Sequence, residues 1–248
     1  MAILVVPARY ASKRLPGKPL LAETGKPLIV HVLERALQSS RVTRAVVATD
    51  DERILQAVRD AGAEAVLTSK DHTSGTDRIA EVAAGFQSEP FFVNLQGDEP
   101  EIDPADIDLL VSTLEAAGTE MATLASPISD PEEFNDPAVV KVVMDTRGDA
   151  LYFSRAPIPC DRDGDGPAEC YRHLGIYGFT AEALRRFAAL SPSVLEQTEK
   201  LEQLRALGAG MKIRVALVKS APPGIDTMEA YRAFVNRTAS ATLGQGRG

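Results

Sequence analysis

Apolar residues in this chain follow two alternating patterns, short continuous runs and longer stretches with a helical period. Short runs of apolar and β-branched residues predict buried strands. The predicted strands are residues 3–6, 45–49, 65–68, 91–95, 122–127, 139–144, 151–154, 173–179 and 212–218. Stretches in which apolar residues recur every three or four positions predict helices. The predicted helices are residues 28–38, 52–61, 76–85, 105–117, 181–190, 195–207 and 228–236.

Strands and helices alternate regularly through the first half of the chain. This order predicts an α/β fold with a doubly wound, mostly parallel, Rossmann-like sheet. Between about residues 121 and 179, strands follow one another without long helices, which indicates an antiparallel insertion that covers a site or builds a dimer interface. We therefore predict one domain over residues 1–238 that contains this insertion. Residues 239–248 are low in complexity and are expected to form a flexible tail.

Composition narrows the class of protein. The chain has 248 residues, of which 44% are hydrophobic, enough to bury a full core. A net charge of -8 argues against general nucleic-acid binding, because that function needs a broad basic face. No apolar stretch approaches the roughly 20 residues of a membrane span, and the N-terminus lacks a signal-peptide pattern. We expect a cytoplasmic protein without membrane insertion. Cys160 and Cys170 are expected to be reduced thiols, with a disulfide or a metal-binding pair as the alternative.

Residues 7–20, with the sequence PARYASKRLPGKPL, carry four cations and no acid. The cations are Arg9, Lys13, Arg14 and Lys18. The segment lies between the first strand and the first helix, where open α/β folds bind phosphates. Neither G-x-x-x-x-G-K-[ST] nor G-x-G-x-x-G is present, so side chains as well as the backbone would hold the phosphates. The alternative is a solvated basic loop.

Two acidic segments follow strands. Asp98, in the segment NLQGDEP over residues 94–100, comes just after the fourth strand and is a candidate Mg2+ ligand. Gly97 beside it would permit a tight turn or a close approach. Asp226 follows the last strand and would supply a second carboxylate, although it also precedes a helix and could be its N-cap. Sequence spacing does not show whether the two carboxylates meet.

Six segments, in this order along the chain, resemble the 3-deoxy-manno-octulosonate cytidylyltransferase family, the CMP-Kdo synthetases. They are residues 7–20, HTSGTDR at 72–78, NLQGDEP at 94–100, YFSR at 152–155, RHLGIYGF at 172–179 and EKLEQLR at 199–205. The resemblance implies a nucleotide-diphospho-sugar transferase-like fold and a homodimer. It implies that CTP and Kdo react, with Mg2+, to give CMP-Kdo and pyrophosphate. That reaction activates Kdo for lipopolysaccharide biosynthesis.

The resemblance also implies roles for individual residues. The catalytic residues would be Arg9, Lys18, Asp98 and Asp226, and the two aspartates would hold the magnesium. The CTP-binding residues would be Pro7, Ala8, Arg9, Lys18, Ser74, Gly75 and Arg78. The sugar-binding residues would be Arg14, Gln96, Arg155, His173, Tyr177, Glu202 and Gln203.

Several of these residues have a structural interpretation when taken without the family. Glu202 and Gln203 would lie on a solvated face of one helix, with Glu199 and Gln203 four residues apart on the same face. His173 would be a structural histidine. By the resemblance, Arg78 would support either the loop that reads cytosine or the phosphates. Thr73 stands where many relatives are expected to carry glutamine.

Three functions stay open at this point. The first is a Kdo cytidylyltransferase, and the second is a cytidylyltransferase for another acidic sugar, such as 8-amino-Kdo or a sialic acid. The third is a nucleotide sensor without catalysis. A sensor would not need both the metal ligands and the cations for a leaving pyrophosphate.

Overall fold

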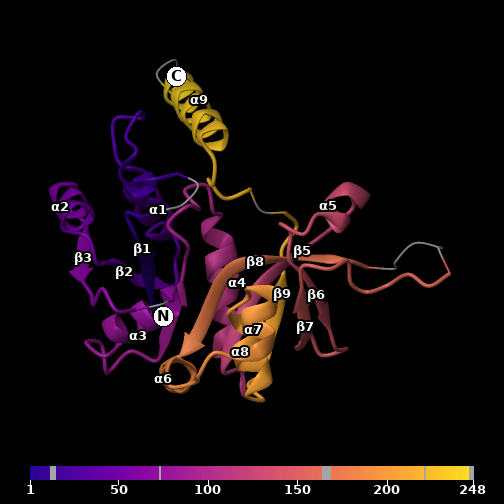
Figure 1. Ribbon diagram of the computed structural model, residues 1–248. Helices are drawn as coiled ribbons and strands as arrows, with labels where there is room; N and C mark the ends of the chain where they lie inside the picture. The colour runs from indigo at the N-terminus through magenta and orange to yellow at the C-terminus, as the bar shows by residue number, and fades with distance from the viewer. Residues whose placement is uncertain (12–14, 73, 164–168, 221, 246–248) are drawn as a thin grey trace. The chain divides into compact units, whose positions relative to one another are not determined.

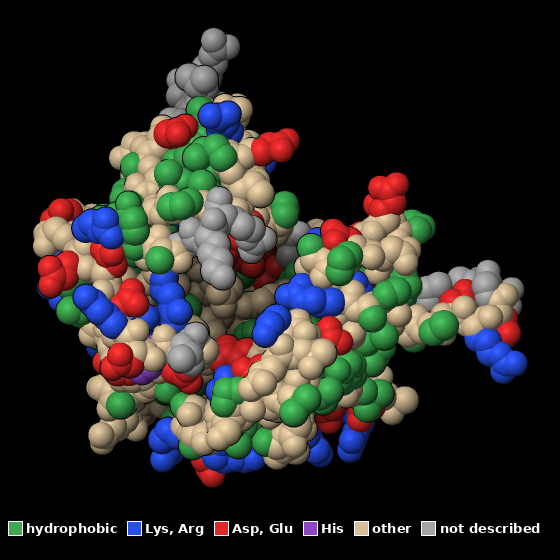
Figure 2. All heavy atoms as spheres, in the orientation of Figure 1, with side chains coloured by type: hydrophobic (Ala, Val, Ile, Leu, Met, Phe, Trp, Pro, Cys, Tyr) green, Lys and Arg blue, Asp and Glu red, His purple; other side chains and the backbone are tan. Residues whose placement is uncertain are grey.

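The computed structural model describes residues 1–11, 15–72, 74–163, 169–220 and 222–245 (Figure 1). Contacts between Cα atoms group the chain into two compact units. The first unit comprises Ile3–Phe86, Asn94–Pro104 and Pro222–Gly248, and the second comprises Met1–Ala2, Gln87–Val93 and Ala105–Ala221. On the face shown in Figure 2, acidic and basic side chains are interspersed. Among the described residues, no helix is long and apolar enough to cross a membrane.

The first unit contains parallel strands with helices between them. Its strands are β1 (Ala2–Ala8), β2 (Val42–Thr49) and β3 (Glu64–Leu67), in the order β3-β2-β1. β2 and β3 pair in parallel, with Val46 opposite Glu64. The helical elements are η1 (Lys18–Leu20), α1 (Leu28–Ala36), α2 (Glu52–Asp60), α3 (Gly75–Ala83) and α9 (Met228–Gln245). β1 is an unbroken apolar run because its residues are buried, as in a central strand.

Helix α9 packs on the segment that joins β1 to α1. Its Tyr231 and Phe234 share a buried cluster with Leu15 and Leu28. The Tyr231 hydroxyl accepts a hydrogen bond from Glu23 N (2.8 Å). His31 on α1 meets Phe234 edge-on, with ring centroids 5.1 Å apart and planes at 87°, so it is packed. This contact holds the start of α9 next to the basic turn, which matters for Asp226 just before the helix.

The second unit combines parallel and antiparallel pairing. Its strands are β4 (Phe91–Asn94, whose last residue belongs to the first unit), β5 (Met121–Pro127), β6 (Lys141–Met144), β7 (Ala150–Ser154), β8 (Tyr171–Thr180) and β9 (Ile213–Leu217). β5 pairs with β8 in antiparallel and with β9 in parallel. β6 pairs with β7 and β8, both in antiparallel. Antiparallel pairing is thus present where the sequence predicted it.

Five helices belong to this second unit. They are α4 (Pro104–Glu115), α5 (Pro131–Asn135), α6 (Ala181–Ala188), α7 (Val194–Glu199) and α8 (Gln203–Gly208). Gly178 on β8 allows α4 to pack closely, because a Cβ there would lie 2.4 Å from Leu114 Cδ1. The α/β fold class predicted from the sequence is confirmed.

Every predicted strand has a counterpart, but one predicted helix was wrong. Residues 195–207 form two helices, because Lys200 adopts a left-handed conformation with φ 56 and ends α7. Glu199 and Gln203 therefore do not share a face of one helix. α9 continues to Gln245, into the segment predicted as a tail. The single domain over 1–238 stays a prediction beside the two compact units.

Candidate active site

Residues predicted to bind CTP line a cleft of about 240 Å³ in the first unit. The end of β1, η1, the start of α3 and the turn after β4 form its walls. Its lining residues are Pro7, Ala8, Arg9, Lys18, Pro19, Gly75, Gln96, Gly97 and Asp98. A Cβ on Gly97 would lie 3.4 Å from Pro7 O, so the glycine allows the turn to approach β1. Gln96, predicted as a sugar ligand, is part of this cleft.

Lys18 joins the two carboxylates predicted to hold metal. Its Nζ lies 2.7 Å from Asp98 Oδ2 and 3.1 Å from Asp226 Oδ1. The side chains are 12%, 22% and 40% exposed, in the order Lys18, Asp98, Asp226. The backbone contributes as well, because Ile225 N donates to Asp98 O (2.8 Å). Thr227 Oγ1 accepts from Ala230 N (3.1 Å), so this threonine caps α9, whereas the Asp226 carboxylate contacts Lys18.

The donor set fits magnesium. Asp98 and Asp226 offer only oxygen ligands, and Mg2+ typically takes one or two carboxylates and completes its shell with water and substrate phosphate. Within the described ranges, no group of three His, Cys, Asp or Glu residues is placed to hold a metal alone. A metal at this pair would therefore depend on water and phosphate oxygens for the rest of its shell.

The basic turn is closed at its base by a contact that the sequence did not reveal. Gly17 N donates to Tyr10 O (3.0 Å), and Gly17 has φ 70, which favours glycine. A Cβ on Gly17 would lie 3.3 Å from the Tyr10 ring. Arg53 of α2 stacks on that ring, 3.5 Å from its centroid. Lys13 and Arg14 lie outside the described residues.

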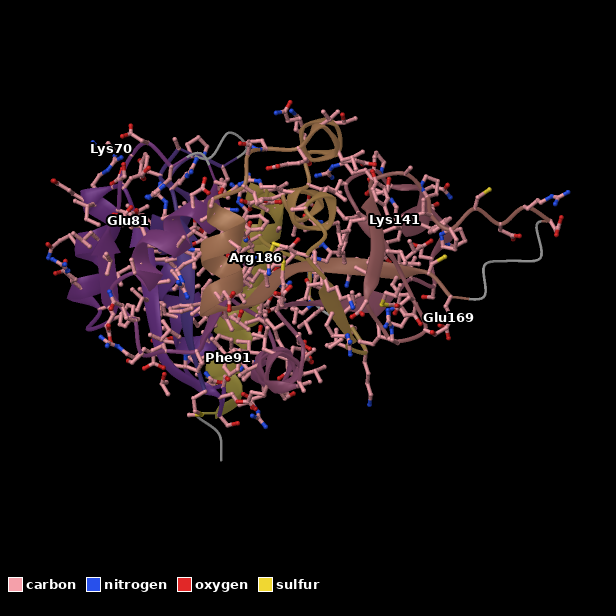
Figure 3. All side chains as sticks on the ribbon, turned by 90° about the horizontal axis from the view of Figure 1, so that it is seen from below. Lys70, Glu81, Phe91, Lys141, Glu169 and Arg186 are labelled. Atoms are coloured by element: carbon pink, nitrogen blue, oxygen red, sulfur yellow. The ribbon has the colours of Figure 1, made fainter. Side chains whose placement is uncertain are left out.

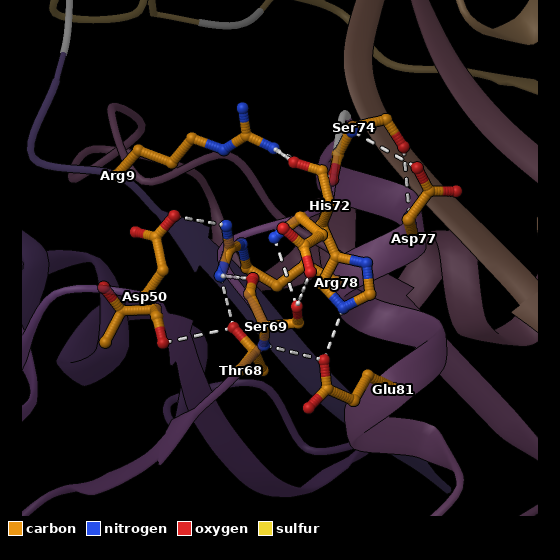
Figure 4. A network of polar contacts seen from close by, with 11 residues as sticks. Arg9, Asp50, Thr68, Ser69, His72, Ser74, Asp77, Arg78 and Glu81 are labelled. Atoms are coloured by element: carbon orange, nitrogen blue, oxygen red, sulfur yellow. Dashed lines mark hydrogen bonds and ion pairs between the residues drawn. The ribbon is translucent and has the colours of Figure 1, made fainter.

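Arg78 places its guanidinium between Asp50 and the residues that begin the loop between β3 and α3 (Figure 4). Its side chain is 0% exposed and forms an ion pair with Asp50 (2.8 Å). Its guanidinium also donates to Thr68 Oγ1 and to Ser69 O (3.3 Å). Of the two roles that the sequence allowed, this placement favours support of the loop. Thr73 lies outside the described residues.

Glu81 of α3 ties down the same loop. Burial alone would raise the pKa of Glu81, but the bond from Ser69 N (3.0 Å) and the contact with His72 bring it below its ordinary value. Arg9 Nη2 donates to His72 O (2.7 Å), which links the end of β1 to the loop. Together with Arg78, these bonds fix the loop backbone at Ser69 and His72 (Figure 4).

Ser74 opens α3 with a capping box. Its hydroxyl accepts from Asp77 N (3.1 Å), and Asp77 Oδ2 accepts from Ser74 N (3.3 Å). The helix predicted over residues 76–85 therefore begins at Gly75, with Ser74 as its cap. Ser74 retains one hydroxyl proton to donate, and Gly75 beside it lines the cleft. Their contact with cytosine stays a prediction.

Five of the predicted sugar ligands gather in the second unit. His173 and Tyr177 on β8 have ring centroids 5.3 Å apart. Burial, and secondly the charge of Glu202, raise the pKa of Tyr177 well above its ordinary value. Gln203 at the start of α8 is 4% exposed, so it is not on the solvated face that the residues alone suggested. Arg155 after β7 completes the group. The seventh predicted ligand, Arg14, lies outside the described residues.

A partly buried hydrogen-bond network holds Arg155 in place. Its Nε donates to Glu199 O (2.8 Å) and its Nη1 to Pro137 O (2.9 Å). The Glu199 carboxylate in turn accepts from Ser154 Oγ (2.7 Å) and Arg155 N (3.0 Å). These bonds join β7 to the end of α7 and so fix where α8, with Glu202 and Gln203, begins.

Lys141 on β6 was missed by the sequence analysis (Figure 3). It is 0% exposed, and its Nζ donates to three backbone carbonyls, Asp136 O (2.9 Å), Val139 O (2.7 Å) and Arg155 O (2.7 Å). Burial lowers the pKa of Lys141. The Lys141 ammonium group thus fixes the backbone at Arg155 through its bond to Arg155 O. The one signal in the sequence was a lysine at the head of an apolar strand.

An α/β fold with a cationic turn, a carboxylate pair and a cleft at the strand ends defines a nucleotide-binding enzyme. Residues 3–213 match the family model described as cytidylyltransferase. The 3-deoxy-manno-octulosonate cytidylyltransferase of Aeromonas hydrophila is 51% identical over 238 residues, which cover 91% of this chain and 94% of that protein. The one of Xanthomonas oryzae is 50% identical, with 96% of each covered. The chain belongs to the cytidylyltransferase family.

Solved structures agree with that assignment. A structure of CMP:2-keto-3-deoxy-manno-octonic acid synthetase complexed with CTP superimposes with a TM-score of 0.91 at 45% identity, covering 97% of this chain and 99% of that one. A cytidylyltransferase from Leptospira borgpetersenii superimposes with a TM-score of 0.62 at 19% identity, covering 94% and 84%. This second likeness shows the fold alone.

Proposed function

We propose that this chain transfers the cytidylyl group of CTP to the anomeric hydroxyl of Kdo, giving CMP-Kdo and pyrophosphate, and so activates Kdo for lipopolysaccharide biosynthesis. The observation that carries the proposal is that Lys18, which lines the cleft with Asp98, also contacts Asp226. Relatives that share about half of their residues with this chain over more than nine-tenths of its length are named for this reaction, which supports the proposal.

The reaction needs no covalent enzyme intermediate. The sugar hydroxyl oxygen attacks the α-phosphorus of CTP in line, the bond from that phosphorus to the bridging oxygen breaks, and pyrophosphate leaves. The hydroxyl proton passes to solvent. Arg9 and Lys18 neutralise the triphosphate and the departing pyrophosphate, and their main contribution is position and charge.

Mg2+ is the proposed cofactor, and Asp98 and Asp226 would hold it. When bound, it supplies charge that lowers the pKa of the attacking hydroxyl. With Asp98 and Asp226 holding the metal, Lys18 would bind phosphate oxygens of the nucleotide.

Base and sugar recognition fall to different parts of the chain. In the first unit, Ser74 and Gly75 read cytosine on the loop that Arg78 supports, and Pro7 and Ala8 line the nucleotide cleft. In the second unit, Arg155, His173, Tyr177, Glu202 and Gln203 bind Kdo. Gln96 and Arg14 are the remaining proposed sugar ligands, from the first unit and the basic turn.

The active form is proposed to be a cytoplasmic homodimer. Leu151 on β7 is 62% exposed within the antiparallel insertion and offers apolar surface to a second copy. Sedimentation velocity of the purified chain tests this directly. A mass of one chain at micromolar concentration would exclude the dimer.

Pyrophosphate release tests the function. Purified protein with CTP, Kdo and Mg2+ should release pyrophosphate, whereas Asp98→Asn should abolish release and keep the wild-type circular dichroism spectrum. A panel of Kdo, 8-amino-Kdo and a sialic acid, each offered with all four nucleoside triphosphates, should show the highest kcat/KM for Kdo with CTP. A higher kcat/KM with another sugar would identify that sugar as the substrate in place of Kdo. CTP binding without pyrophosphate release would indicate a sensor.

A further inference from the structure

Thr123 on β5 lies at the centre of a group of polar contacts that has no role in the proposed reaction so far. One of these contacts is with His173, a proposed sugar ligand. Thr123 is 0% exposed. The register between β5 and β8 shifts after it, because Thr123 pairs with Tyr177 and the next residue, Leu124, pairs with Leu174. This bulge turns two carbonyls of β8 toward the threonine hydroxyl. A β-bulge of this kind re-aims backbone and side-chain groups at functional sites.

Three groups surround Thr123 Oγ1. Ile176 O lies at 2.7 Å, Leu174 O at 3.2 Å and His173 Nε2 at 2.9 Å. The two carbonyls can only accept, and the hydroxyl has one proton to donate. If that proton pointed at the histidine, the oxygen lone pairs would face a carbonyl oxygen at 2.7 Å, which is repulsive. The proton therefore goes to Ile176 O, and His173 Nε2–H donates to Thr123 Oγ1.

This bond determines whether the other ring nitrogen of His173, Nδ1, carries a proton. With Nε2 protonated, Nδ1 carries a lone pair in the neutral ring. Burial lowers the pKa of His173 to about 3, so the ring stays neutral at physiological pH. Among the described residues, no hydrogen-bond partner meets Nδ1. Phe153 packs edge-on against the ring, with centroids 4.9 Å apart and planes at 75°, and holds its orientation.

We propose that Thr123 is a positioning residue that holds His173 in the Nε2–H tautomer, so that Nδ1 accepts a hydrogen bond from a hydroxyl of the sugar. The role of His173 rests on the proposed function, whereas the tautomer does not. Since a bare Nδ1 cannot donate, it cannot bind the sugar carboxylate. Cationic residues then bind the sugar carboxylate, and His173 selects for a sugar hydroxyl.

Nitrogen NMR tests the tautomer without any turnover. Protonated and bare ring nitrogens differ widely in 15N chemical shift, and the chain has only three histidines, so His173→Gln assigns the signal. Wild type and Thr123→Ser should both show a protonated Nε2 and a bare Nδ1. Thr123→Val, which removes the oxygen at nearly constant volume, should lose this preference. A protonated Nδ1 in the wild type overturns the proposal.

Kinetics test the consequence for the sugar. Thr123→Val should raise the KM for Kdo about fivefold, the value of roughly one neutral hydrogen bond, with the KM for CTP changed less than about twofold. Thr123→Ser should keep both near wild type. An unchanged KM for Kdo, or equal rises in both KM values, overturns the positioning role. If no Kdo were consumed, the proposed function would fail, yet the NMR result would still decide the tautomer.

Discussion

Replacing Lys18 by methionine removes the ammonium group that contacts both Asp98 and Asp226. Lys18→Met keeps most of the side-chain volume and leaves two carboxylates facing the same space. At an effective dielectric constant of about 20, the two contacts at 2.7 and 3.1 Å correspond to about 6 and about 5 kcal/mol of gross attraction. Most of that gain is offset by the cost of removing the three charges from water.

The net effect on stability follows from burial. Removing one partner of a well-buried pair costs about 3–5 kcal/mol, but Asp226 is 40% exposed, so water screens the remaining repulsion. We expect Lys18→Met to lower the free energy of unfolding by about 2 kcal/mol, or about 4–8 °C in melting temperature for a chain of this size. Mg2+ should restore at least half of this loss, because it supplies charge to the same carboxylates.

The assay is thermal unfolding in EDTA and in millimolar Mg2+, for wild type, Lys18→Met and a control, Lys26→Met. Lys26 pairs with Glu34 on the surface, where the two side chains are 42% and 51% exposed, so its loss should cost less than about 0.5 kcal/mol. If Lys18→Met were as stable as the control, or if Mg2+ stabilised all three proteins equally, the reasoning about the carboxylate pair would be refuted.

Three further predictions address other parts of the chain. Because burial lowers the pKa of His173 to about 3 while the unfolded value is near 6.5, the unfolded state binds more protons than the folded state between these values. The His173 contribution to stability should therefore fall by about 1.4 kcal/mol from pH 8 to pH 5.5 in urea unfolding. His31, whose pKa burial also lowers, acts in the same direction, and His173→Gln should keep only the His31 part. A wild-type curve flat over that range would contradict this. Arg78→Met should lower the free energy of unfolding by about 3 kcal/mol and raise the KM for CTP, because it removes the ion-pair partner of Asp50 and loosens the loop. An unchanged KM for CTP would mean that the loop does not contribute to CTP binding. Gly17→Ala should destabilise more than Gly25→Ala, since both have positive φ but only the first would press on the Tyr10 ring; equal losses would leave backbone strain as the whole effect.

The order of strands and helices could be predicted from the sequence, because buried strands are continuous apolar runs and the helices have a helical apolar period. The basic turn and Asp98 could be placed at strand ends for the same reason. The meeting of Asp98 with Asp226 could not, because it depends on α9 packing against α1 through Tyr231 and Phe234. Only long-range packing brings these segments together.

The burial of charged side chains was the feature hardest to predict from the sequence. Arg78 and Lys141 are residue types that are mostly exposed, and nothing local marks them as 0% exposed. The break at Lys200 was hidden as well, because Leu201 and Leu204 continue an apolar period across it, and lysine rarely adopts positive φ. Thr123 looked like one residue of an apolar strand, and its importance depends on a bulge in the strand opposite.

The identity of the product tests the central claim most directly. Phosphorus NMR of a reaction containing the purified chain, CTP, Kdo and Mg2+ should show one phosphodiester signal, from CMP-Kdo, growing in equal amount with pyrophosphate as CTP disappears. Attack at the α-phosphorus requires this equality. Appearance of CDP with inorganic phosphate, or of CMP without a sugar diester, would contradict the account.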